Sequence, residues 1–522
     1  MTADTTLKKV GFASLIMMAS VFASRIIGVF REMAIAGIGG VHARVDAYQI
    51  AFVIPEILNH IVASGFLSIT FIPIFTHYLV RGQTEDGYRI FSIIMNTFGL
   101  FLFGLILVCM VYTPLIVGFF APGISDAATF ELAVKMTRII IPAQFFFFTG
   151  GLFMAVQFAN ERFFIPALAP LIYNLSIILG GVVLGPHMGM EGFAWGVLTG
   201  AFLGNFALQI LGAKKEGTRY FFLLSLTHPD LVTYIKLTLP LMLGLTMTFS
   251  VEILLKYFGS FLDPGSIAAM NYAVRIMFVL VGLFGQAVGT ASYPYMAKLA
   301  EERDLLPLNQ LLNRTLKFIF LVIPISVLFM VLSYEIVVLL FQRGRFDTTA
   351  TTLTSGVLPF FMAGAFAFSA QNIVSRGFYA LKNTLFPVIF TTCCVVLSLP
   401  VIWMGMHHFG AKGLALGLSI TTAFQCLLLY ECWNRKSGNT DKKQVYLFLV
   451  KMILLSLVFG LLLKLSADGL RLFIDQTRFI GSAAIAVVIG IEFCILFILS
   501  GPLFKIQEIT DFKTRLIRKF QR

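Results

Sequence analysis

The chain has 522 residues, of which 58% are hydrophobic and only 12% are charged, and its mean hydropathy is +0.89. Soluble domains carry about 25% charged residues, so this composition excludes an ordinary soluble protein and indicates a membrane protein. The formal net charge of +13 does not indicate nucleic-acid binding, because the basic residues are concentrated in short connections and in the C-terminal tail.

Apolar runs long enough to cross a bilayer recur along the whole chain. A bilayer core needs about 20 apolar residues per helix, and on that basis we predict an all-α integral membrane protein of about fourteen transmembrane helices. No connection is long enough to fold as a soluble catalytic domain. The predicted ranges are 10–36, 46–79, 89–120, 129–158, 164–184, 190–212, 229–258, 266–296, 312–341, 350–378, 384–406, 412–432, 444–466 and 479–503.

Lys and Arg residues favour the connections on one side of the predicted membrane. These connections and the N-terminus hold Lys8, Lys9, Arg81, Arg89, Lys214, Lys215, Arg219, Lys298, Arg303, Arg314, Arg435, Lys436, Lys442 and Lys443. An even number of helices puts the basic tail on the same side. The positive-inside rule therefore predicts a multi-pass membrane protein with both termini in the cytoplasm.

The two halves of the chain resemble each other at a constant offset of 221 residues. The matching pairs are Phe120 with Phe341, Gly123 with Gly344, Asp126 with Asp347, Pro73 with Pro294, and Pro166 with Pro387. The repeat predicts two parallel six-helix lobes, residues 1–215 and 216–435. Residues 436–522 then hold helices 13 and 14 and the basic tail. Two lobes around a central cavity are typical of transporters.

Three arginines fall inside predicted membrane helices. Arg25 and Arg31 share the first helix, and Arg275 belongs to the opposite lobe. Placing an ionised side chain at the bilayer centre costs at least about 2.5–3.5 kcal/mol of free energy, so each arginine is expected to have a structural or functional role. Guanidiniums that converge on one cavity would suit a pyrophosphate, because they offer bidentate donors to phosphate oxygens.

A structural interpretation of the first helix also stays open. Arg25 could pair with Glu32 or Asp46, and Arg31 could extend to the membrane surface. In the seventh predicted helix, Glu252 and Lys256 have the spacing of an intrahelical ion pair, and a role in ion coupling is the alternative.

Polar residues in the second predicted helix and the six cysteines are the candidates to consider as metal or cofactor ligands. Asn59 and His60 either face the cavity or form a hydrogen-bonded pair in the core. No second ligand has a suitable spacing from His60, and none of the six cysteines has metal-binding spacing. We therefore predict no metal site and no cofactor, while coupling to Na⁺ or to the membrane potential stays open.

At these positions the chain resembles the MurJ-type lipid II flippases of the multidrug/oligosaccharidyl-lipid/polysaccharide exporter superfamily. The resemblance covers nearly the whole chain. Its matching segments are Ser24-Arg25, Arg31-Glu32, Asp46-Ala47-Tyr48, Pro55, Gly65, Phe71 to Pro73, Phe163 to Pro170 with Asn174, Arg275, Gly285, Gly289-Thr290, Arg343 to Asp347, Ser375-Arg376 and Tyr379-Ala380.

The resemblance implies a V-shaped, two-lobe transporter that works by alternating access. It implies that Arg25, Arg31 and Arg275 bind the pyrophosphate of a polyprenyl-linked lipid and that Asp46 is a functionally important acid. It also implies that helices 13 and 14 form a groove for the polyprenyl tail. The implied partners are this lipid, the surrounding membrane lipids and the cell-wall synthesis machinery.

The chain departs from the family pattern mainly in the second helix. Asn59, His60 and Ser64 replace a basic pair and an acid, and Glu56 of the same helix stands where Asn is usual. Leu280 and Asn383 depart elsewhere. These departures keep open an alternative substrate, another polyprenyl-pyrophosphate oligosaccharide such as an O-antigen or exopolysaccharide unit. A membrane enzyme would need paired carboxylates or a His/Asp cluster near the arginines, and the sequence has neither. We therefore predict a lipid II flippase of peptidoglycan biosynthesis and not an enzyme.

Overall fold

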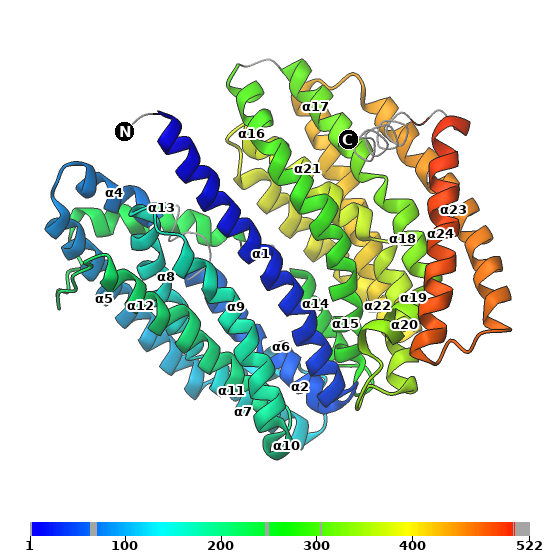
Figure 1. Ribbon diagram of the computed structural model, residues 1–522, viewed down its shortest axis with the longest axis horizontal. Helices are drawn as coiled ribbons and strands as arrows, with labels where there is room; N and C mark the ends of the chain where they lie inside the picture. Colours follow the sequence, from blue (N-terminus) through cyan, green and yellow to red (C-terminus); the bar gives the residue numbers. More distant parts are fainter. Residues whose placement is uncertain (1–2, 63–69, 246–249, 303–304, 505, 507–522) are drawn as a thin grey trace. The chain divides into compact units, whose positions relative to one another are not determined.

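The computed structural model describes residues 3–62, 70–245, 250–302, 305–504 and 506, and within these ranges the regular structure is helical throughout. The chain divides into two compact units (Figure 1). The first unit holds Met1–Ala268 and Arg343–Arg345, and the second holds Ala269–Gln342 and Phe346–Arg522. The side chains of Lys8, Lys9 and His60, residues Ser64 and Gly65, and the basic tail lie outside the described part of the chain.

In the first unit, α1 packs along α9, and α9 in turn packs on α11 (Figure 1). Two segments, η2 and η3, are π-helical turns that continue α9 and α11. Its elements are α1 (Ala3–Gly39), α2 (Ala43–Ala51), α3 (Val53–Val62), α4 (Ile72–Val80), α5 (Thr84–Val111), α6 (Thr113–Phe120), α7 (Ala127–Ile140), α8 (Ala143–Ala159), α9 (Phe164–Leu179), η2 (Gly180–Leu184), α10 (Gly185–Met188), α11 (Glu191–Gly200), η3 (Ala201–Ala207), α12 (Leu208–Lys215), α13 (Pro229–Leu245) and α14 (Ser250–Gly259).

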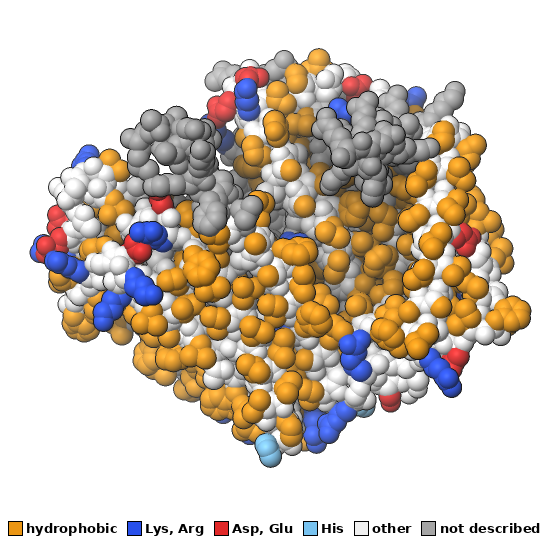
Figure 2. All heavy atoms as spheres, in the orientation of Figure 1, with side chains coloured by type: hydrophobic (Ala, Val, Ile, Leu, Met, Phe, Trp, Pro, Cys, Tyr) orange, Lys and Arg blue, Asp and Glu red, His pale blue; other side chains and the backbone are white. Residues whose placement is uncertain are grey.

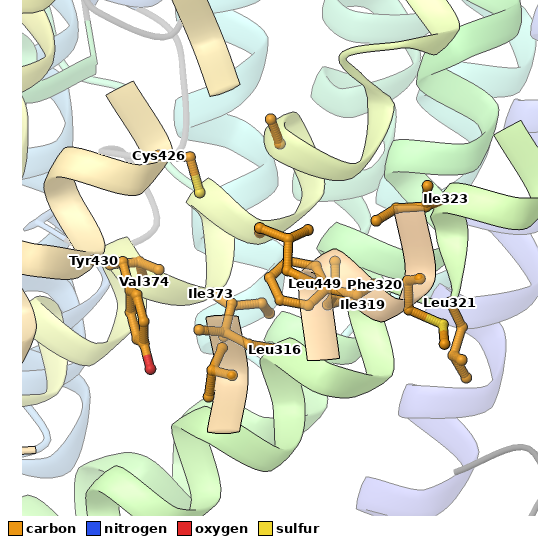
Figure 3. Packing of buried hydrophobic residues seen from close by; sticks show 14 of the residues in the cluster. Leu316, Ile319, Phe320, Leu321, Ile323, Ile373, Val374, Cys426, Tyr430 and Leu449 are labelled. Carbon is orange, nitrogen blue, oxygen red and sulfur yellow. The ribbon is translucent and has the colours of Figure 1, made fainter. Parts of the chain in front are cut away.

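The second unit has a buried apolar core to which several helices contribute (Figure 3). Leu316 and Ile319 of α17 lie with Ile373 of α21, Tyr430 of α22 and Leu449 of α23. Its elements are α15 (Ser266–Leu280), which begins in the first unit, η5 (Val281–Gln286), α16 (Ala287–Glu301), α17 (Leu305–Ile319), α18 (Val322–Val331), α19 (Ser333–Phe341), α20 (Thr348–Met362), α21 (Ala365–Ala380), α22 (Leu385–Ser437), α23 (Lys442–Arg471) and α24 (Phe479–Leu503).

Within the described ranges, nine helices or joined helices are long and apolar enough to cross a membrane, and α20 with α21 forms a tenth candidate bent by 42°. Large apolar side chains such as Leu457 and Val487 are more than half exposed. Figure 2 shows hydrophobic side chains over most of the visible face. Such a surface is stable only in lipid. The prediction of an all-helical membrane protein is confirmed, and the count of fourteen helices stays a prediction.

The element α22 contains the two helices that the sequence predicts as 384–406 and 412–432. Its backbone leaves the helical region at Gly410, where φ is +58° and ψ is −137°. A Cβ atom on Gly405 would lie only 2.7 Å from the carbonyl oxygen of Gly413. Residues eight apart in a straight helix are separated by about 12 Å, so the chain reverses at Gly410 and the two helices pack closely without side chains between them.

The internal repeat recurs in the structure as two matching helix caps. The carboxylate of Asp126 accepts a hydrogen bond from the backbone N–H of Thr129 at 2.9 Å, and Asp347 accepts one from Ala350 at 2.8 Å. Each aspartate thereby caps the helix that follows it, α7 or α20. The hydrogen bonds from Thr129 hold the pKa of Asp126 below its ordinary value. The lobe boundaries at 215 and 435 stay a prediction, because the first unit extends to Ala268 and includes α13, which packs on α3 and α5.

A buried ion pair joins α23 to the rest of the second unit and gives a stability prediction. The side chain of Glu335 is fully buried and accepts two hydrogen bonds from Arg471, from Nε at 2.9 Å and Nη2 at 2.9 Å. We expect Glu335→Gln to cost about 2–3 kcal/mol, somewhat less than breaking a fully buried pair, because Arg471 keeps some contact with solvent. Thermal unfolding in detergent measures the loss.

The matched control is Glu85→Gln. Glu85 pairs with Arg89 at 3.1 Å, but both side chains are more than half exposed. Exposed pairs contribute about 0–1 kcal/mol, so this control should unfold at the wild-type temperature. Equal unfolding temperatures for both variants would contradict a stabilising role for Glu335.

Candidate functional site

Arg31 of α1 is held in place by hydrogen bonds inside the first unit. Its Nη1 donates to Asn174 Oδ1 at 3.0 Å, and its Nη2 donates to Glu32 Oε1 at 2.6 Å. Asn174 lies on α9 and also donates to Ser24 Oγ at 3.2 Å. The guanidinium is therefore bonded within the protein rather than extended to the membrane surface, and the packing of α1 on α9 sets its position.

The other two predicted arginines lie in different surroundings. Arg25 is on the same helix as Arg31 and is exposed at the surface of the first unit. Arg275 is half-buried on α15, in the part of this helix that belongs to the second unit. The structure therefore brings Arg25 and Arg31 together on one helix, while their convergence with Arg275 stays a prediction.

Asp46 of α2 is buried and caps the start of the helix that carries Arg275. Its carboxylate accepts hydrogen bonds from the backbone N–H groups of Gly265 at 2.5 Å and Ala268 at 2.7 Å. Gly265 directly precedes α15 and Ala268 lies in its first turn, where the unpaired amides and the positive end of the helix dipole favour an anion. Asp46 thus has a definite structural task, fixing the start of α15 to α2.

Lys256 of α14 has a partner that the sequence did not reveal. Its side chain is almost fully buried, and its Nζ lies 3.0 Å from Glu56 Oε2 of α3. The sequence predicted a partner one turn away, Glu252, which is half-buried on α14. Asn59 is half-buried on α3, and His60 follows it in the same helix. The link from Lys256 to Glu56 gives the lysine a structural role between two helices.

This ion pair yields a second stability prediction. We expect Lys256→Met to cost about 3 kcal/mol, because it removes one charge of a largely buried ion pair between α14 and α3. The double variant Glu56→Gln/Lys256→Met should regain most of that loss, since it removes both charges. Thermal unfolding of the single and double variants in detergent measures the difference. A single variant as stable as the wild type would show that the pair contributes nothing.

A further arginine, Arg376 of α21, is fixed in the second unit. Its Nη2 donates to Thr290 Oγ1 at 3.2 Å, and its guanidinium lies 6.0 Å from the centre of the Tyr293 ring. Gly289 leaves the space for it, because a Cβ atom there would lie 2.8 Å from Arg376 Nε. The sequence analysis included these residues only as matching segments of the resemblance, and their contact depends on the packing of α16 on α21.

No group of three or more His, Cys, Asp or Glu side chains suited to a metal ion occurs in the described part of the chain. Arg31 and Arg376 are each held by hydrogen bonds within their own unit, and the acid Asp46 serves as a helix cap. Guanidinium groups are suited to binding an anion by charge and hydrogen bonding. The long apolar helices, together with the arginines that they carry, are typical of a polytopic membrane transporter.

Solved structures of similar fold are membrane transporters as well. An inward-facing multidrug resistance MATE family transporter of the MOP superfamily aligns with a TM-score of 0.68 over 80% of this chain and 96% of that one. The sequence identity is 13%, so this likeness concerns the fold alone.

A family model described as lipid II flippase MurJ matches residues 35–488, and the chain belongs to this family. The lipid II flippase MurJ of Burkholderia cenocepacia is 27% identical over 416 residues, which cover 78% of this chain and 80% of that protein. A protein of Buchnera aphidicola subsp. Baizongia pistaciae, described as a probable lipid II flippase MurJ, is 27% identical over 454 residues, covering 84% and 87%. A solved lipid II flippase MurJ in an inward closed conformation has 26% identity and a TM-score of 0.75, and the alignment covers 94% of this chain and 100% of that one.

Proposed function

We propose that this chain translocates lipid II, the lipid-linked peptidoglycan precursor, from the cytoplasmic to the periplasmic leaflet of a bacterial inner membrane. The observation that carries the proposal is the match to the lipid II flippase family over residues 35–488. The family match favours lipid II over other polyprenyl-linked oligosaccharides. Moving a lipid between leaflets makes and breaks no covalent bond, so the chain is a transporter and not an enzyme.

Arg25, Arg31 and Arg275 bind the pyrophosphate in this proposal. A guanidinium has five N–H donors, and the hydrogen bonds from Arg31 to Asn174 and Glu32 leave others for a ligand. Because those bonds fix the guanidinium beforehand, binding a phosphate orders little additional side chain. This arrangement supports a role for Arg31 in substrate binding.

The transport cycle alternates the access of the arginine site between the two leaflets. The headgroup enters from the cytoplasmic leaflet while its polyprenyl tail stays in lipid, and the site then opens to the periplasm. Both termini lie in the cytoplasm, as the basic connections indicate. The arginines hold the pyrophosphate with modest affinity, because a tightly bound product would not leave.

The experiment that tests this function has two arms. In the first, the chain is expressed in a bacterium depleted of its own lipid II flippase, and growth is measured at verified membrane levels of the protein. In the second, the purified protein is placed in liposomes with lipid II or with another polyprenyl-pyrophosphate oligosaccharide, and headgroup translocation is measured. Growth rescue together with preferential movement of lipid II supports the proposal. Movement of only the other lipid refutes it.

A further inference from the structure

A cavity of about 770 Å³ lies in the first unit at the end of α1 that is remote from the N-terminus. It is lined by the last turn of α1, the first turn of α2, the segment from η2 to Met190, Pro264 and the short segment Gly344–Arg345. Ligand pockets in proteins have volumes of about 300–1,000 Å³, so the cavity is large enough for a small ligand or a lipid headgroup. Arg25 and Arg31 do not line it, so it is separate from the proposed transport site.

The lining of this cavity is positively charged. Arg44 and Arg345 contribute two guanidiniums, and none of the residues that line it is acidic. Within the described ranges, neither arginine forms an ion pair with a carboxylate. Ala43 and Arg44 also form the N-terminal turn of α2, where His42 provides no side-chain cap. Two arginines beside a helix N-terminus favour an anion.

Close backbone contacts hold the Gly344–Arg345 segment against the end of α1. The backbone N–H of Arg345 donates to the carbonyl oxygen of Gly37 at 2.7 Å. Gly344 has φ of +61°, and a Cβ atom there would lie 2.3 Å from the same oxygen. Gly40 has φ of +68°, and its Cβ would lie 2.6 Å from the carbonyl oxygen of Arg345. The Gly344–Arg345 segment therefore lies directly on the end of α1, which would not be possible with larger residues.

One wall of the cavity is apolar and continues into the lipid-facing surface. Val182 lines the cavity and is 52% exposed. Leu179 and Val183, which neighbour it on α9 and η2, are about as exposed, at 59% and 62%. A molecule with an anionic head and a hydrocarbon chain matches this combination, because the head meets the arginines and the chain follows α9 and η2.

We propose that this cavity binds the phosphate-bearing headgroup of a lipid with net negative charge, with the phosphate between Arg44 and Arg345 and the hydrocarbon chain along Leu179 to Val183. This site is additional to the proposed transport function, and with both termini in the cytoplasm it opens on the periplasmic side. A resident anionic phospholipid and the polyprenyl pyrophosphate of the exported lipid share the same headgroup chemistry. The following experiment distinguishes these two sources.

The test is lipid binding to the full-length protein in detergent, measured by native mass spectrometry without any transport step. The probes are dioleoyl phosphatidylglycerol, dioleoyl phosphatidylcholine and undecaprenyl pyrophosphate. All three are titrated against protein that carries Arg25→Ala and Arg31→Ala, so that the proposed transport site contributes little. The test variant adds Arg44→Gln and Arg345→Gln to this background. A charge-retaining variant adds Arg44→Lys and Arg345→Lys instead. The matched control adds Arg478→Gln, because Arg478 lies outside the cavity and its ion pair with Asp475 is exposed.

We expect the glutamine pair to weaken binding of an anionic lipid by at least about tenfold, since each lost charged hydrogen bond weakens binding by roughly that factor. The lysine pair should keep most of the binding, and the control should keep all of it. A loss with phosphatidylglycerol identifies a resident phospholipid, and a loss with undecaprenyl pyrophosphate alone identifies the exported lipid. Unchanged binding in the glutamine pair, or equal loss for phosphatidylcholine, overturns the proposal. Lipid binding is measured without transport, so a failure of growth rescue would refute the proposed function without changing the outcome of the binding test.

Discussion

Arg31→Ala is expected to abolish growth of a flippase-depleted bacterium that depends on this chain, although the protein still reaches the membrane. The substitution removes donors to the pyrophosphate and also leaves the buried Glu32 without the guanidinium that lies 2.6 Å away. A hydrogen bond to a charged group contributes about 1.5–3 kcal/mol, so loss of one weakens binding by at least about tenfold. Growth and headgroup translocation in liposomes are the measurements.

Two further variants separate substrate binding from general damage. Asn174→Ala removes the α9 side chain that orients Arg31 and should lower translocation by less than Arg31→Ala, because the charge remains. Arg162→Ala is the matched control, since Arg162 pairs with Glu216 through a side chain that is 65% exposed. This control should support normal growth. If Arg31→Ala also supports normal growth at equal expression, the proposed arginine mechanism is wrong.

Features that depend on local sequence were predicted well. The apolar run 479–503 became α24 with the same bounds, because burial in lipid requires only length and apolarity. The repeat paired Asp126 with Asp347, and both are helix caps in the structure, a role that was not predicted although a cap depends on residues only three positions apart.

Partners that are distant in sequence could not be predicted. Lys256 was assigned to Glu252 by the four-residue spacing, whereas its Nζ contacts Glu56, 200 positions earlier. The resemblance implied that Asp46 is an important acid, but it did not indicate the two backbone N–H groups that donate to it, which lie 219 and 222 positions later. Helix periodicity indicates which residues share a face, yet it does not indicate which helix covers that face. The same limit applies to Arg345, whose place at the end of α1 requires close packing at Gly344.

Gly150→Ala is expected to prevent correct folding of the first unit. A Cβ atom on Gly150 would lie 1.4 Å from the backbone carbonyl oxygen of Asn205, where α8 packs on η3. Overpacking a core usually costs about 1–3 kcal/mol, because side chains can move. Here the obstacle is backbone, so a whole helix would have to shift and the cost should exceed that range. The measurement is the amount of monodisperse protein on size-exclusion chromatography, followed by its unfolding temperature.

Gly28→Ala provides the matched control for this substitution. Gly28 also lies within a long helix, α1, but nothing lies within 4 Å of the position that its Cβ atom would occupy. Alanine favours a helix over glycine by about 0.5–1 kcal/mol, so this variant should be at least as stable as the wild type. If neither variant folds, an added methyl group is harmful even at Gly28, and the failure of Gly150→Ala is not explained by its close contact with Asn205. If both fold, α8 and η3 separate at little cost, and the close contact at Gly150 does not hold the first unit together.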